Sequence, residues 1–184
     1  MARCLLLLGL LGLIELPLHV FAHRLDEYLQ ATLVTIEPEA LRLQINLTPG
    51  VAVAEQVLAL IDADRDGVVS TNEAVAYGDK LKRQLIVKLD DRDVELKLAG
   101  SNFPPVTELR AGSGIIQVEF VAKVSALSAG PHRMRFENRH MPMIGVYLFN
   151  AAQSRLKSVE IQGQKRNKTQ SVGEIEFTCD AKRG

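Results

Sequence analysis

Twelve consecutive residues carry four carboxylates at spacings suited to one hard cation. They occupy positions 62–73 and read DADRDGVVSTNE. Calcium takes about 6–8 oxygen ligands at roughly 2.3–2.6 Å, and a short loop can supply them when alternate residues point inward and the chain turns sharply. The candidate ligands are Asp62, Asp64, Asp66, Val68, Ser70 and Glu73.

Each candidate has a distinct expected role. The three aspartates would each give one carboxylate oxygen, Val68 its backbone carbonyl, and Ser70 its hydroxyl or a bound water. Glu73 would complete the coordination shell with two oxygens. Gly67 allows the turn, because the backbone conformation needed there is costly for a residue with a Cβ atom. A plain acidic surface turn is the alternative, since Asp and Gly are common in turns, but it does not predict Glu73.

The sequence on both sides of the loop predicts helices. Apolar residues recur there at the spacing of one helical face. They are Ala54, Val57, Leu58 and Ile61 before the loop, and Ala74, Tyr77 and Leu81 after it. Ser70 and Glu73 also form an S-x-x-E capping box, which is typical of a helix start. A helix, a loop and a second helix are therefore predicted over about residues 52–83.

This segment of about 30 residues resembles an EF-hand, and the resemblance implies that it binds Ca²⁺. EF-hands usually occur in pairs, whereas this sequence contains one such motif. Two arrangements stay open for a single hand: it could pair with its copy in a homodimer, or it could be a structural clip between two strands.

The first 22 residues are typical of an export signal. Arg3 provides a positive start, Cys4 to Ile14 form a short apolar run, and Val20-Phe21-Ala22 fits a cleavage site. An uncleaved membrane anchor is the alternative. Cleavage would leave a mature chain of residues 23–184, periplasmic or secreted, in which Cys179 has no second cysteine to pair with.

The remainder of the mature chain predicts strands. Alternating or continuous apolar runs, separated by turn residues, occur throughout it. They lie at residues 28–36, 41–47, 85–89, 94–98, 116–120, 134–136, 146–149, 159–161 and 175–177. The runs at 85–89 and 94–98 flank the turn sequence D-D-R-D and predict a hairpin. We expect one mainly β domain, a β-sandwich with the helix-loop-helix as an insert; a β-barrel is the alternative.

Three further segments suggest a second resemblance. A-H-R-L-D-E-Y-L-Q, V-Y-L-F-N and G-E-I-E-F-T are similar to the exported N-terminal region of bacterial hydrogenase and urease accessory permeases, the HupE/UreJ-like proteins. That resemblance implies a Gram-negative periplasmic location and a membrane-protein partner. No second apolar run of 18 or more residues occurs, so no transmembrane helix is expected in the mature chain.

The composition and the motifs of the sequence argue against some classes of function. With 22 basic and 22 acidic residues the formal net charge is zero, which does not favour nucleic acid as a partner. No catalytic motif or acid–base pair is evident, so we expect no enzyme. The leading expectation is a calcium-binding exported module with a structural or interaction role. The alternative is a copper- or nickel-handling module, in which the amino group and imidazole of His23 chelate the metal and His132 and His140 are further candidates.

Overall fold

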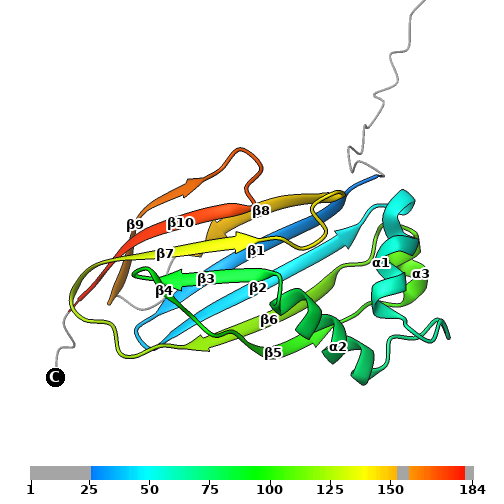
Figure 1. Cartoon of the computed structure of the whole chain (residues 1–184), viewed down its shortest axis with the longest axis horizontal. Coiled ribbons are helices and arrows are strands. Elements are labelled where there is room, and N and C mark those ends of the chain that lie inside the picture. The colour runs from blue at the N-terminus through cyan, green and yellow to red at the C-terminus, as the bar shows by residue number, and fades with distance from the viewer. Residues whose placement is uncertain (1–25, 153–157, 181–184) are drawn as a thin grey trace, which may run out of the picture.

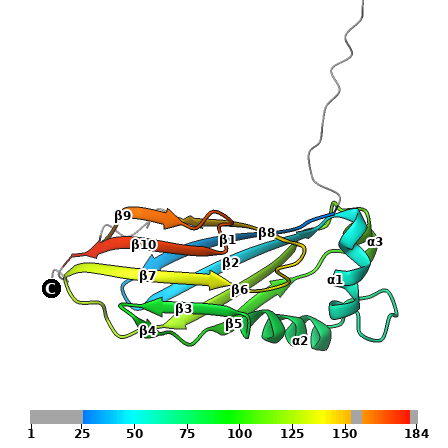
Figure 2. The same ribbon diagram turned by 45° about the horizontal axis from the view of Figure 1, so that its top comes forward.

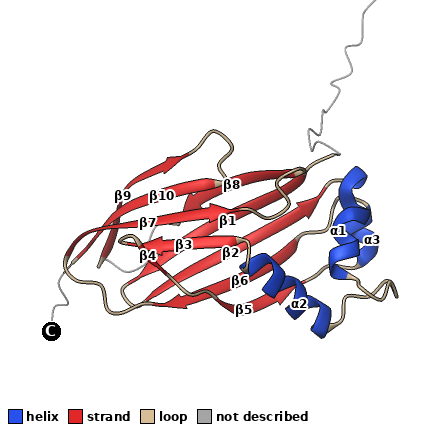
Figure 3. Ribbon diagram, viewed as in Figure 1, coloured by secondary structure: helices blue, strands red, loops and turns tan. Residues whose placement is uncertain are grey.

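The computed structural model of this chain describes residues 26–152 and 158–180, where ten strands form two facing sheets (Figures 1 and 3). The first sheet contains, in spatial order, β5 (Lys97–Asn102), β6 (Ile116–Lys123), β2 (Ala40–Pro49), β1 (Tyr28–Glu37) and β8 (Gly145–Ala151). The second contains β4 (Arg92–Asp93), β3 (Leu85–Leu89), β7 (Gly130–Asn138), β10 (Val172–Cys179) and β9 (Val159–Arg166). The predicted β-sandwich-like fold is confirmed.

Alternating side chains of these strands fill the space between the sheets. In β2, the residues Leu41, Leu43, Ile45 and Leu47 are each 0 % exposed, while the residues between them face the solvent. The facing sheet contributes buried aromatic and aliphatic side chains from β7 and β10, namely Met134, Phe136, Ile175 and Phe177. Full burial of one such side chain contributes about 1.5–3 kcal/mol, so this apolar alternation is what holds the two sheets together.

The prediction of a hairpin over residues 85–98 is right at the turn and wrong after it. The chain does turn at Asp90 and Asp91, both with positive φ, but β4 pairs with β3 over only two residue pairs. It then crosses to the other sheet, where β5 runs antiparallel to β6. Leu96 is buried at the crossing. Alternation shows which side chains face the core, and both sheets share that core, so the pattern does not tell which sheet a strand joins.

The helices gather at one end of the sandwich (Figures 1 and 2). Between β2 and β3 lie the short 3-10 turn η1 (Val51–Val53), α1 (Ala54–Ile61) and α2 (Thr71–Lys82), which confirms a helical insert at the predicted place. A third helix, α3 (Val106–Arg110), links β5 to β6. It was not predicted, because five residues are too few to show a helical period. None of the helices in the described residues is long and apolar enough to cross a membrane.

The predicted export signal, residues 1–22, and His23 lie outside the described residues.

Candidate metal centre

Hydrogen bonds made by its own residues fix both ends of the loop between α1 and α2. Asp62 follows the last turn of α1, and its backbone N–H donates to the Leu58 carbonyl. Ser70 is the N-cap of α2 and accepts from the Glu73 N–H, while the Glu73 Oε2 accepts from the Ser70 N–H at 2.9 Å. The predicted capping box is therefore confirmed, and it sets where α2 begins.

The three aspartates of the loop converge on one point. A ligand oxygen from each of Asp62, Asp64 and Asp66 lies within 4.8 Å of the others. Loop N–H groups donate to all three carboxylates: Gly67 to Asp62 at 3.1 Å, Asp66 to Asp64 at 3.2 Å, and Val68 to Asp66 at 2.8 Å. The loop is thus wound around its own carboxylates, which repel one another when no cation lies between them.

Asp62 is the most informative member of this group. It is only 5 % exposed, and its Oδ1 is buried without a hydrogen-bond partner among the described residues. A buried polar atom left unpaired costs about 1–3 kcal/mol, and more when it is charged. A cation held by the three aspartates would satisfy this atom, so the donor set fits a metal ion.

Glu73 joins the two ends of the loop. Its Oε1 accepts from the Ala63 N–H at 2.6 Å, and its Oε2 accepts from the Ser70 hydroxyl at 2.7 Å. The Ser70 backbone and side-chain hydrogen bonds, with a smaller contribution from Ala63, lower the pKa of Glu73, so its carboxylate is ionised at neutral pH. The structure thus brings three of the predicted ligands together and places Glu73 across the loop, bonded to the backbone at both ends.

The remaining loop positions differ in how they compare with their expected roles. Gly67 has φ +83°, in the region that favours glycine, and a Cβ added there would meet nothing within 4 Å. The Val68 side chain is 65 % exposed, which fits a residue that offers only its carbonyl. The Ser70 hydroxyl is engaged with Glu73, so it is available to an ion only if it leaves that bond.

Residues from α3 border the loop, which the sequence did not indicate. The Arg110 Nε donates to Glu55 Oε1 of α1 at 2.6 Å. A cavity of about 300 Å³ lies between them and the loop, lined by Glu55, Leu58, Ala59, Asp62, Arg65 and Arg110. On the other side, Val69 packs partly buried against the core, next to a hollow formed with residues 103–107.

A buried polar network ties α2 to the sheets. Tyr77 of α2 has its hydroxyl 2.6 Å from the Tyr28 hydroxyl of β1 and 3.0 Å from His140 Nε2. The other ring nitrogen of His140 faces the side-chain oxygen of Gln84. That oxygen can only accept, so Nδ1 carries the proton and Nε2 accepts from Tyr77, which in turn accepts from Tyr28. Burial, and then the charge of Lys80, lowers the pKa of His140 to about 4, consistent with a neutral ring.

The two histidines considered for a transition metal are both committed to internal bonds. His140 uses its ring nitrogens on Tyr77 and Gln84, and His132 uses its own on Asp90 and the Ser128 carbonyl. Within residues 26–152 and 158–180, the three loop aspartates are the one His, Cys, Asp or Glu group with metal-binding spacing. Neither histidine therefore offers a free nitrogen to copper or nickel.

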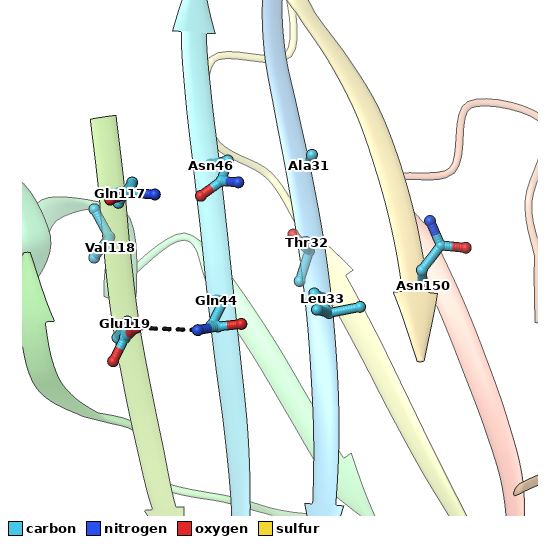
Figure 4. Close-up of a pocket in the computed structure, with 9 residues that line it drawn as sticks. All are labelled: Ala31, Thr32, Leu33, Gln44, Asn46, Gln117, Val118, Glu119 and Asn150. Atoms are coloured by element: carbon cyan, nitrogen blue, oxygen red, sulfur yellow. Dashed lines mark hydrogen bonds between the residues drawn. The ribbon is translucent and has the colours of Figure 1, made fainter. Parts of the chain in front are cut away.

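A separate hollow of about 230 Å³ lies on the outer face of the first sheet (Figure 4). Amide side chains line much of it, and Gln44 Nε2 donates to Glu119 Oε1 at 3.1 Å. The lining residues are Ala31, Thr32, Leu33, Gln44, Asn46, Gln117, Val118, Glu119 and Asn150. They include no histidine or cysteine, and the hollow opens to solvent, so it adds nothing to the metal centre.

The chain matches no model of a known protein family and no curated protein. The functional evidence for this chain is therefore the geometry of the loop and of its supports.

Proposed function

We propose that residues 62–73 bind one calcium ion, and that the ion stabilises the helical insert. The observation that carries the proposal is Asp62 Oδ1, a buried carboxylate oxygen without a hydrogen-bond partner in the described residues. Asp62 is also one of three aspartates whose ligand oxygens lie within 4.8 Å of one another. Asp62, Asp64 and Asp66 would hold the ion, with the Val68 carbonyl, Ser70 and Glu73 completing the shell as in the EF-hands that the loop resembles.

The chemistry of the donors favours calcium over other metals. Every candidate donor is an oxygen, which suits hard cations and not copper, nickel or zinc. Magnesium demands near-ideal octahedral geometry and usually keeps several waters. A loop with four carboxylates and a carbonyl offers the larger, flexible oxygen shell that calcium takes.

The packing of α1 and α2 favours a structural role for the ion over a role as a conformational switch. Ala54, Val57, Leu58 and Ile61 of α1 are buried. A Cβ on Gly78 of α2 would come within 2.8 Å of Leu98, so α2 lies directly against β5. Two helices held in this way have little room to reorient when the ion binds. The predicted export signal would bring the chain to the periplasm or outside the cell, where weak binding of about 10⁻⁴–10⁻³ M would suffice.

Calorimetric titration of calcium into the signal-free protein tests the proposal. We expect saturable one-site binding in the parent, and its loss in the double variant Asp62→Asn, Glu73→Gln. Asp93→Asn is the matched control, because it removes one exposed carboxylate outside the loop and should leave binding unchanged. Absence of binding at millimolar calcium, or equal binding in the double variant, would reduce the loop to an acidic turn. A magnesium titration in parallel tests the choice of metal.

A further inference from the structure

His132 lies where three segments meet, at the end of the sandwich where β3 turns into β4. Its ring faces inward from β7, with the side chain 8 % exposed. The ring stacks on Phe177 of the neighbouring strand β10, at a centroid distance of 5.5 Å. The loop of residues 124–129, which links β6 to β7, passes beside it. His132 therefore contacts the turn, the loop and the second sheet together.

Both ring nitrogens of His132 face groups that can only accept a hydrogen bond. Nδ1 lies 2.7 Å from Asp90 Oδ2, and Nε2 lies 2.9 Å from the Ser128 carbonyl oxygen. A neutral imidazole can donate from one nitrogen, whereas the imidazolium donates from both. The two contacts are therefore satisfied together only when the ring is charged. Burial lowers the pKa of His132, but the bonds to Ser128 and Asp90 outweigh it and the net pKa is raised.

The 124–129 loop is fixed at its start and held less firmly at its end. The Val124 and Leu127 N–H groups donate to the carbonyls of Glu39 and Pro38, both at 3.0 Å. After Leu127, the Ser128 carbonyl lies against His132 Nε2, and Gly130 follows with φ +122°. The loop forms one wall of a cavity of about 530 Å³, and the turn after β3 forms another.

The other charged groups around His132 come from each element packed against it. Asp90 also accepts from the Arg133 N–H of β7 at 2.9 Å, and Asp91 receives Arg133 Nη2. Arg92 and Asp93 of the turn, Glu95, and Lys123 of β6 line the cavity. On β10, burial and then the charges of Asp180 and Asp90 raise the pKa of Cys179. Histidine is the residue type among these whose ordinary pKa lies nearest to neutrality.

We propose that Asp90, Ser128 and His132 form a pH-sensitive latch that holds the end of the 124–129 loop over this cavity. In the charged state the ring joins the loop to the turn. When the ring loses one proton, Nδ1 keeps the other, because a carboxylate is the stronger acceptor. Nε2 then presents a lone pair to the Ser128 carbonyl, that bond is lost, and residues 128–129 are released. The latch is closed at lower pH and opens as pH rises through the pKa of the folded protein.

Two measurements on the signal-free protein test the latch. An NMR titration of the His132 ring should give a midpoint above the ordinary histidine value of about 6.5. Backbone NMR order parameters of Ser128 and Ala129 should fall across the same pH interval, with no matching change in β2, because these are the residues that the loss of the Ser128–His132 bond releases. A midpoint at or below the ordinary value, or order parameters of Ser128 and Ala129 that do not change with pH, would overturn the proposal.

Asp90→Asn is the discriminating variant. Its side-chain amide can donate to Nδ1, so a neutral ring keeps its N–H on the Ser128 carbonyl, and the side-chain oxygen still accepts from Arg133. We expect Ser128 and Ala129 to stay ordered across the whole pH range. Opening of the variant with the same pH midpoint as the parent would show that His132 does not control the loop.

Discussion

At the scale of single residues, the loop of residues 62–73 combines a backbone requirement with an electrostatic one. Gly67 allows the chain to turn so that its own N–H donates to Asp62. The turn places the buried Asp62 beside two exposed aspartates. If the loop binds calcium as proposed, its ordering depends both on a residue without a Cβ atom and on a cation that offsets the clustered charge. These two contributions can be separated by mutation.

Gly67→Ala isolates the backbone contribution. At φ +83° an added Cβ meets no neighbouring atom, so the expected cost is that of the left-handed conformation, about 1–2 kcal/mol. Urea unfolding at saturating calcium measures it. Gly100→Ala is the control, because Gly100 also has free space but an ordinary φ; it should be neutral or slightly stabilising. Equal losses at the two positions would show that the turn does not need glycine.

At the scale of elements, α2 is held by a directed chain of hydrogen bonds that starts on β1. Tyr28, Tyr77 and His140 are each at most 1 % exposed, so none of their polar atoms can turn to water as a replacement. The same buried cluster includes Gln30, which donates to the His140 carbonyl at 2.8 Å. The position of α2 is therefore specified by polar contacts as well as by apolar packing.

Tyr77→Phe should destabilise the protein by about 1–3 kcal/mol, because it leaves two buried polar partners without their bond. Tyr147→Phe is the matched control. Its hydroxyl donates to the His140 carbonyl at 2.9 Å, but that carbonyl also accepts from Gln30, so less should be lost. Chemical unfolding of both variants makes the comparison. A loss for Tyr147→Phe as large as for Tyr77→Phe would contradict the inference that the partners of Tyr77, unlike the His140 carbonyl, are left unpaired when its hydroxyl is removed.

The outer edge of β8 is covered by side chains of the β9–β10 hairpin. Gln164 accepts from the Ala151 N–H at 2.6 Å and donates to the Phe149 carbonyl. Arg166 donates to the same carbonyl and to Asn150. Unpaired edge strands are templates for pairing with another chain, so these contacts protect the edge.

The double variant Gln164→Ala, Arg166→Ala should therefore self-associate more than the parent. Light scattering after size exclusion, over a range of concentrations, measures it. Lys165→Ala on the same strand is the control, since its ammonium pairs with Glu176 and not with β8. A double variant with the parent's molar mass at every concentration would show that the edge needs no such cover.

At the scale of the whole molecule, the sequence predicts what depends on near neighbours. The alternation of Leu41 to Leu47 and the capping box of Ser70 and Glu73 are local patterns, and both are confirmed. The crossing at Leu96, the contact of Arg110 with Glu55, and the unpaired oxygen of Asp62 were not predicted. Each depends on packing between segments distant in sequence, and local periodicity carries no information about such distances.

The two described histidines give the molecule opposite responses to pH. His140 is neutral, with its pKa lowered to about 4 by burial and then by Lys80, so on acidification the unfolded chain takes up a proton before the folded one does. His132 has a raised pKa and contributes stability below the unfolded value, which is lost as pH rises through the folded one. The contribution of His140 to the free energy of unfolding therefore falls by roughly 2 kcal/mol between about pH 7 and about pH 5.

Urea unfolding of the parent and of His140→Gln at the two pH values tests whether His140 lowers the stability on acidification. The variant will be less stable at both, because the network around Tyr77 is disturbed, but its stability should change less with pH. All carboxylates and His132 are common to both proteins, so the difference between the two pH dependences belongs to His140. If the difference vanished, His140 would titrate alike in the folded and unfolded states. The lowered pKa of His140 in the folded protein would then be wrong.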